Sequence, residues 1–146
     1  MRFWDSSALV PLVLRQPQTP AARRLMEQDS EMVVWWGSAI ECASAIARLR
    51  RDGHLTALAE QDARGLFDTV RGTWFEVQPG DAVREQALRL LRLHPLRAAD
   101  ALQLAAALEW AGSPPEGGFV TFDDRLREAA QREGFSIPDT RGTRDT

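Results

Sequence analysis

The chain opens with Arg2-Phe3-Trp4-Asp5-Ser6-Ser7-Ala8-Leu9-Val10, a short apolar segment that runs directly into a carboxylate. Phe3 and Trp4 indicate a strand, and Asp5 stands where that strand gives way to a helix. A strand at the N-terminus is normally central in a parallel sheet, and its carboxyl end faces the ligand crevice. We therefore expect Asp5 at that crevice. An aspartate at this position can also act only as a helix N-cap, which stabilises by about 1 kcal/mol.

The composition limits the class of protein. With 146 residues and 44% hydrophobic content, the chain fits one domain, which we place at residues 1–138, followed by a polar tail at 139–146 that we expect to fray. A single cysteine, Cys42, excludes an internal disulfide and a thiolate zinc site. The chain shows neither a signal peptide nor a membrane-spanning run, so we expect a cytoplasmic protein that does not contact a membrane.

The net charge of −3 and the pI near 5.4 lack the basic footprint that is usual for a nucleic-acid binder. All 18 basic residues are arginine, whose planar fork binds phosphate in a bidentate manner. A GC-rich coding sequence explains the same bias, so charge and composition decide nothing about an RNA partner.

Strands and helices alternate along the sequence. Hydrophobic periodicity, glycine and proline predict helices at 6–14, 17–28, 38–52, 56–70, 81–93, 96–111 and 123–133, and after the first strand further strands at 32–36, 73–77, 119–122 and 135–137. Helical spacing also predicts that Ile40 turns inward and that Leu58 is an apolar anchor of its helix. Such alternation predicts an α/β fold, a three-layer α/β/α sandwich around a parallel sheet of four to five strands. The carboxyl ends of all strands then lie along one edge.

Further acids fall at this edge. Glu41 lies in the first turn of the helix after the second strand, where Ser38 and Glu41 can also form a capping box. Asp100 lies in the first turn of an almost wholly apolar helix, where an unpaired charge is costly. Asp123 or Asp124 follows the fourth strand, and either can merely cap the next helix. Each acid has a local explanation, but together the four predict one site.

Converging carboxylates predict a cation. At about 5 Å, two of them repel by roughly 3 kcal/mol at an effective dielectric near 20. Oxygen ligands without histidine or cysteine select Mg²⁺ or Mn²⁺ over zinc. Such an ion activates water and neutralises charge on a phosphate, so the pattern favours phosphodiester hydrolysis.

The motifs resemble those of PIN-domain nucleases of the VapC toxin type over residues 1–137. The resemblance rests on Asp5-Ser6-Ser7-Ala8-Leu9, Ser38-x-x-Glu41, the stretch from Leu96 to Ala105 around Arg97-Ala98-Ala99-Asp100-Ala101-Leu102, and Val120-Thr121-Phe122-Asp123. It implies a Mg²⁺- or Mn²⁺-dependent endoribonuclease that is neutralised by a small cognate antitoxin and forms a homodimer. By position, Asp5, Glu41, Asp100 and Asp123 match the acidic quartet of the family, and Thr121 matches a neighbouring hydroxyl residue.

Four residues are weaker candidates for contact with substrate or partner: Ser7, Arg48, Thr121 and Asp124. Arg48 lies two turns after Glu41 on the same helix face, so it can reach a phosphate or an antitoxin carboxylate, or simply end the helix in solvent. Asp124 also remains an alternative to Asp123 as the fourth acid.

Two other functions remain open. The chain can be a PIN-like binding module for an antitoxin or RNA that no longer cuts. It can also be a phosphatase or receiver domain with a phosphorylated Asp5, but such proteins typically need a lysine near the site, and this chain has none.

Overall fold

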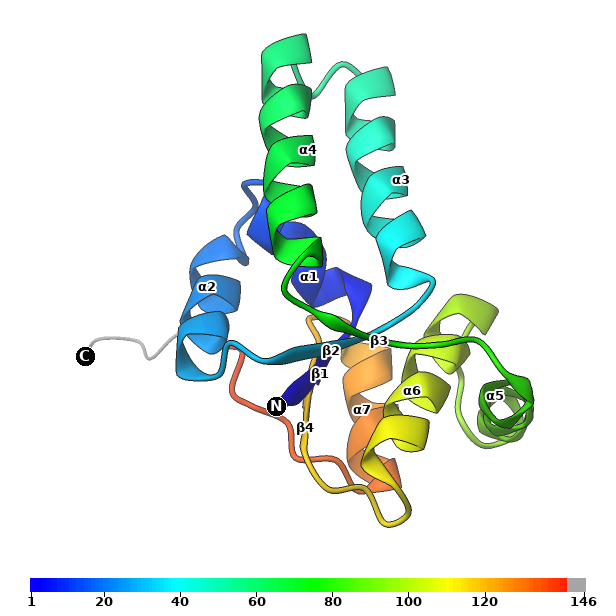
Figure 1. Ribbon diagram of the computed structural model, residues 1–146. Helices are drawn as coiled ribbons and strands as arrows, with labels where there is room; N and C mark the ends of the chain where they lie inside the picture. Colours follow the sequence, from blue (N-terminus) through cyan, green and yellow to red (C-terminus); the bar gives the residue numbers. More distant parts are fainter. Residues whose placement is uncertain (142–146) are drawn as a thin grey trace.

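A computed structural model describes residues 1–141, so residues 142–146 of the predicted tail lie outside the described part. The elements, in chain order, are β1 (Arg2–Trp4), α1 (Ser6–Val13), α2 (Thr19–Gln28), β2 (Met32–Trp35), α3 (Ser38–Arg51), α4 (Ala57–Arg71), β3 (Phe75–Val77), α5 (Asp81–Leu93), α6 (Ala98–Ala111), β4 (Gly118–Val120) and α7 (Asp124–Glu133). Figure 1 shows α3 and α4 side by side, projecting from the sheet.

The sheet is parallel throughout, with the strand order β3-β2-β1-β4. Strand β1 is therefore an inner strand, as its position at the N-terminus predicts. It has β2 on one side and β4 on the other, with Phe3 in register with Val33 and with Phe119. The connection after β1 leads to β2 on one side, whereas the connection after β3 crosses back to place β4 on the other side of β1. Such a reversal is where α/β sheets form their ligand crevice.

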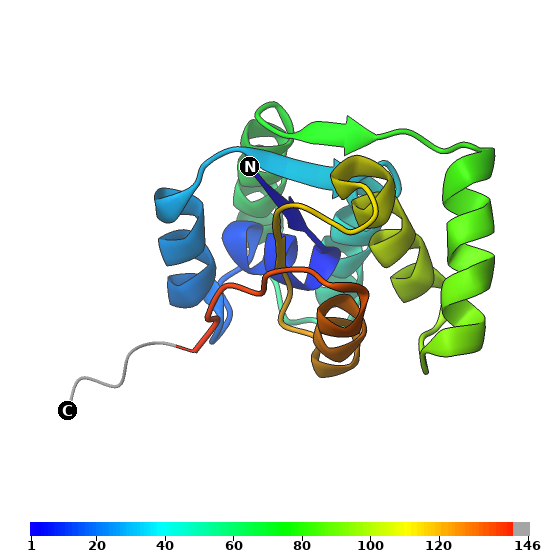
Figure 2. The ribbon, with the colours of Figure 1, turned by 90° about the horizontal axis from the view of Figure 1, so that it is seen from below.

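The two faces of the sheet bury alternate side chains. Phe3, Val33 and Phe119 pack into one core with residues of α5, α6 and α7. Trp4, Val34 and Val120, each one position further along, pack into a second core with residues of α1, α2, α3 and α4. Figure 2 shows α2 and α5 at opposite sides of the molecule. The predicted three-layer α/β/α sandwich is confirmed.

Helix α6 is buried nearly all round, as its composition predicts. Its small and apolar residues from Ala101 to Leu108 are almost all inaccessible, and Gln103 among them is only 1% exposed. Of the described helices, none is long and apolar enough to cross a membrane.

Some local predictions were wrong. The last predicted strand, 135–137, is reduced to a single parallel bridge between Gly118 and Ser136. Ile40 and Leu58, predicted to turn inward, are 65% and 67% exposed, because no element of the described chain covers the faces of α3 and α4 that carry them. Alternation along the second strand predicts that one of its two tryptophans is core, and this is confirmed, since Trp35 is buried while Trp36 is half exposed.

Candidate active site

Asp5 ends β1 and precedes the first residue of α1. Its backbone is extended, which is N-cap geometry, but its carboxylate forms no capping hydrogen bond, so the N-cap explanation fails for the side chain. The residue is only 2% exposed. Burial raises the pKa of Asp5 to about 7, the carboxylates of Asp123 and Asp100 act in the same direction, and the hydroxyls of Ser7 and Thr121 oppose them.

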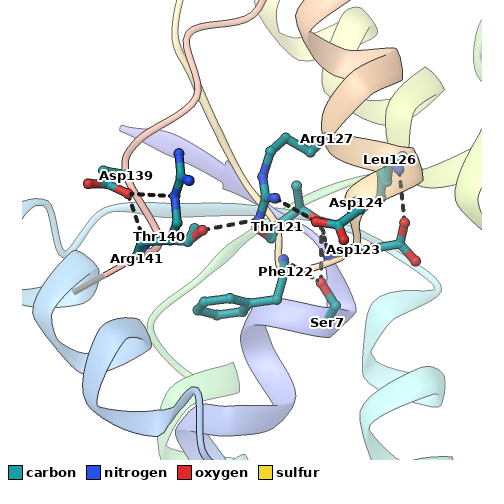
Figure 3. Close-up of polar contacts among 10 residues, drawn as sticks. All are labelled: Ser7, Thr121, Phe122, Asp123, Asp124, Leu126, Arg127, Asp139, Thr140 and Arg141. Carbon is teal, nitrogen blue, oxygen red and sulfur yellow. Dashed lines mark hydrogen bonds and ion pairs between the residues drawn. The ribbon is translucent and has the colours of Figure 1, made fainter.

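Two hydroxyls fix Asp5 from the β1 and β4 ends. Ser7 Oγ donates to Asp5 Oδ1 at 2.7 Å and accepts the backbone N–H of Phe122 at 2.9 Å. Thr121 Oγ1 accepts the backbone N–H of Asp123 at 3.0 Å and lies 3.2 Å from Ser7 Oγ. Figure 3 shows these side chains meeting across the two segments. Thr121 is fully buried, and its hydroxyl orients the turn after β4.

Glu41 is held by donors from two other helices. Ser6 Oγ, at the start of α1, donates to Glu41 Oε2 at 2.6 Å, and the Gln103 amide, on α6, donates to Oε1 at 3.0 Å. The same amide donates to Ser38 Oγ at 2.9 Å. No side chain caps α3 at its N-cap, Gly37. The capping-box explanation of Glu41 is therefore wrong, and its carboxylate faces the interior of the crevice.

Asp100 lies in the first turn of α6, where it is half-buried. Burial raises the pKa of Asp100, the carboxylates of Asp123 and Glu41 raise it further, and Arg97 opposes them. The coupling to Asp123 and Glu41 shows that charges from three separate elements act on one another here.

The structure separates the two candidates for the fourth acid. Asp123 Oδ1 caps α7 by accepting the backbone N–H of Leu126 at 2.9 Å, while the carboxyl group remains on the wall of the crevice. The side chain of Asp124 is 91% exposed and pairs with Arg127 at 2.7 Å. Figure 3 shows Asp124 beside Arg127. Asp123 is the one whose charge raises the pKa of Asp5.

These acids share one hollow, which we term the acidic cavity. It has a volume of about 650 Å³ and contains Asp5, Glu41, Asp100 and Asp123 in its wall, together with Ser6, Ser7 and Arg48. The predicted convergence at the carboxyl edge of the sheet is thus present in the geometry. Arg48 is exposed on α3 and is placed where it can meet a ligand in the cavity.

The donor set suits a hard divalent cation. The acids offer oxygen ligands alone, and Cys42 beside them is buried, with burial raising the pKa of its thiol to about 12. Asp5 and Asp100 both have raised pKa values caused in part by neighbouring carboxylates, which a cation would relieve. Among residues 1–141, no three acidic, histidine or cysteine side chains already form a ligand cluster. The fit therefore rests on the chemistry and the electrostatics of the donors.

Sequence reasoning missed two polar residues of this site, Ser6 and Gln103. The sequence held a signal for Gln103. This glutamine lies one turn after Asp100 and shares the helix face of Asp100, and a polar side chain on an apolar helix needs a buried partner. Nothing in the sequence identifies that partner as Glu41, which lies 62 positions earlier.

Comparisons with known proteins place the chain in a family. A model of the PIN domain matches residues 2–132. The chain is 30% identical over 135 residues to Ribonuclease VapC46 of Mycobacterium tuberculosis (strain ATCC 25618 / H37Rv). The aligned region covers 92% of this chain and 94% of that protein.

Two solved structures share the fold. A toxin-antitoxin complex from Klebsiella pneumoniae has a TM-score of 0.65 at 14% identity and covers 97% of this chain and 98% of its own. The structure of FitAB bound to an IR36 DNA fragment has a TM-score of 0.65 at 12% identity, and the match covers 96% of this chain and 95% of that chain. At these identities the two structures bear on the fold alone. The family model and the ribonuclease relative lead to one conclusion: the chain belongs to the PIN-domain family and, within it, to the VapC type.

Proposed function

We propose that this protein is a metal-dependent endoribonuclease, the toxin of a toxin-antitoxin pair, and that it hydrolyses RNA phosphodiester bonds with water as the nucleophile. The observation that carries the proposal is the acidic cavity, where Asp5, Glu41, Asp100 and Asp123 lie at the switch point of a parallel sheet. The identity to a protein named a ribonuclease adds to it.

The four acids are proposed as catalytic and metal-binding residues. Mg²⁺ or Mn²⁺ bound to them would supply Lewis acidity to the phosphate and lower the pKa of water. Ser7 bonds to Asp5 and is itself bonded to Thr121, and Ser6 and Gln103 hold Glu41, through bonds of 2.6 to 3.2 Å. Fixing the carboxylates in advance reduces the reorganisation that the reaction requires.

A small antitoxin and a second copy of the chain are the proposed protein partners. The solved complex from Klebsiella pneumoniae, described as toxin-antitoxin, supports the first. The exposed Leu88 and Leu91, one turn apart on α5, support a homodimer, because neighbouring apolar side chains on a surface favour protein contacts. Analytical ultracentrifugation of the purified protein tests the dimer; a monomer over the micromolar range contradicts it.

RNA cleavage by the purified protein tests the function. We expect cleavage with Mg²⁺ or Mn²⁺, none in EDTA, and none from Asp5→Ala or Asp100→Ala. Asp68→Ala is a matched control, since Asp68 is an exposed acid on α4 that does not line the acidic cavity. Full cleavage by either site variant contradicts the assignment. Metal binding without cleavage of any RNA favours the silent binding module.

A further inference from the structure

A second cavity adjoins the acidic cavity. It has a volume of about 390 Å³, and its wall consists of Pro95, Arg97, Asp100, Asp123, Asp124 and Arg125. We term it the arginine-flanked cavity. Asp100 and Asp123 belong to the walls of both cavities. Asp100 and Asp123 therefore lie between two hollows, and a chain-like ligand that places one bond at these two acids extends into both.

The two arginines of this cavity are available for a ligand. Arg97 and Arg125 are both exposed, and in the described part of the chain neither forms an ion pair with a carboxylate. Asp124, which also lines this cavity, pairs with Arg127 at 2.7 Å. Arg97 acts on Asp100, since it opposes the rise in the pKa of that carboxyl.

Arg97 and Arg125 are placed where they can reduce the repulsion between the carboxylates and an anionic ligand. A polyanion that enters the acidic cavity meets four carboxylates and, among the lining residues, one arginine, Arg48. Cations in the adjoining cavity, next to Asp100 and Asp123, offset this repulsion and hold the strand beside the bond. Arg97 is the N-cap of α6 and Arg125 lies in the first turn of α7, and such helix ends also favour an anion. The guanidinium fork suits phosphate oxygens.

We infer that the arginine-flanked cavity is a phosphate subsite, in which Arg97 and Arg125 bind a backbone phosphate of single-stranded RNA next to the bond held at the acids. The inference rests on the proposed ribonuclease function and deepens it. It assigns the two cavities to the two sides of the cleaved bond, with Arg48 on one side and the Arg97 and Arg125 pair on the other.

Salt dependence of RNA binding gives the first test. In an Asp5→Asn background with Mg²⁺, fluorescence anisotropy measures the affinity for a short single-stranded RNA between ~50 and ~200 mM KCl. Arg97→Gln/Arg125→Gln should weaken binding by about tenfold. It should also reduce the slope of log K against log salt by ~0.7 for each lost phosphate contact.

A control variant must separate the effect of total charge on RNA binding from the effect of these two positions. Arg71→Gln/Arg84→Gln removes the same two charges from exposed positions outside both cavities, so it measures the long-range effect alone. Arg97→Lys/Arg125→Lys keeps the charge and loses the fork, and we expect an intermediate affinity. An equal loss in the Arg71/Arg84 control and the Arg97/Arg125 variant overturns the inference.

Neutral methylphosphonate linkages then locate the phosphate. One linkage is neutralised at a time along the RNA, and its cost is measured in the parent and in Arg97→Gln/Arg125→Gln. We expect one linkage whose neutralisation weakens RNA binding to the parent but not to the variant. Such a result shows that the two arginines and that phosphate interact directly.

Two results overturn the inference and leave the proposed function standing. One is intact RNA cleavage by the wild type with no coupling at any linkage. The other is a loss of antitoxin binding in the arginine variant with RNA binding unchanged, which makes the cavity a protein site. If the wild type neither binds nor cuts RNA, the proposed function fails and the subsite fails with it.

Discussion

Asp5 and Glu133 are both shielded carboxylates, but their surroundings shift the pKa in opposite directions. Glu133, at the end of α7, accepts from Arg89 at 3.1 Å and lies 2.8 Å from His94 Nε2. Burial works to raise the pKa of Glu133, but the bonds from Arg89 and His94 outweigh it and lower the pKa below its usual value. Asp5 has only hydroxyl partners and acidic neighbours, and its pKa rises to about 7.

The contrast shows what marks a functional acid in this fold. The chain holds 18 arginines and can pair an acid where stability alone is required, as it does for Glu133. At the sheet edge it does not. An acid that is buried, unpaired with a cation and crowded by like charge is a candidate for catalysis or metal binding. The predictions below separate the two kinds of acid.

The largest expected difference concerns activity. Asp5→Asn should lower RNA cleavage by at least ~10³-fold, because the oxygen ligand and its charge are lost at the proposed reaction centre. Glu133→Gln should leave the rate within about twofold, since Glu133 lies outside the acidic cavity. Initial rates at saturating Mg²⁺ measure both. A similar loss in the two variants removes the distinction.

The pH dependence of stability should also have opposite signs. The pKa of Asp5 in the folded protein, about 7, lies above the ordinary value of 3.8 for an aspartate, so the native state binds the extra proton. The contribution of Asp5 to stability is most favourable below pH 4 and is lost as the pH rises through 7, by up to about 4 kcal/mol.

Urea unfolding in EDTA measures this effect. Asp5→Asn should be more stable than the wild type at pH 8, and the difference should shrink towards pH 5, where Asp5 is protonated in the native state. A difference that does not change with pH shows that the burial of Asp5 does not control its ionisation.

Glu133 and its partners Arg89 and His94 form what we term the Glu133 cluster. Its contribution to stability should change with pH in the opposite direction to that of Asp5, and by a smaller amount. Because the pKa of Glu133 in the folded protein lies below the ordinary value of 4.5 for a glutamate, its contribution to stability is present above that value and is lost as the pH falls through the folded pKa. Glu133→Gln should cost about 1 to 2 kcal/mol at neutral pH. Glu128→Gln, which removes an exposed pair with Arg132, should cost less than ~0.5 kcal/mol. Equal costs in the two variants show that the cluster is a surface pair only.

The smallest expected effect is at Asp124. Asp124→Asn should change activity by less than about threefold, because this side chain is 91% exposed and bonded to Arg127. Asp123→Asn should lower activity strongly, and its Asn side chain keeps an oxygen that can cap α7. If Asp124→Asn is the more damaging change, the assignment of the fourth acid is reversed.

The sequence carries most of the fold. Alternating strands and helices predicted the sheet, its inner first strand and the three layers, because apolar periodicity and Gly and Pro stops are local signals. Ile40 and Leu58 were predicted to be buried and are exposed. Side-chain type states a preference for burial, but the partner that satisfies it is a property of the tertiary structure or of a complex.

The site was predictable in part. Asp5, Glu41, Asp100 and Asp123 were predicted to converge because strand ends and helix starts share one edge of a parallel sheet. The hydrogen bonds that orient them were not predictable, since Ser6 and Glu41 are 35 positions apart and Ser7 and Thr121 are 114 apart. Local sequence also favoured a capping box for Glu41, which the structure replaces with bonds from α1 and α6.

Calorimetric titration of the purified protein with Mn²⁺ tests the central claim that these acids form a site which requires a cation. The account predicts binding by the wild type at or below millimolar Mn²⁺. It also predicts a large loss in Asp5→Asn and Asp100→Asn, and no change in Glu133→Gln. Absence of binding by the wild type at millimolar Mn²⁺, or unchanged binding in Asp5→Asn, contradicts it.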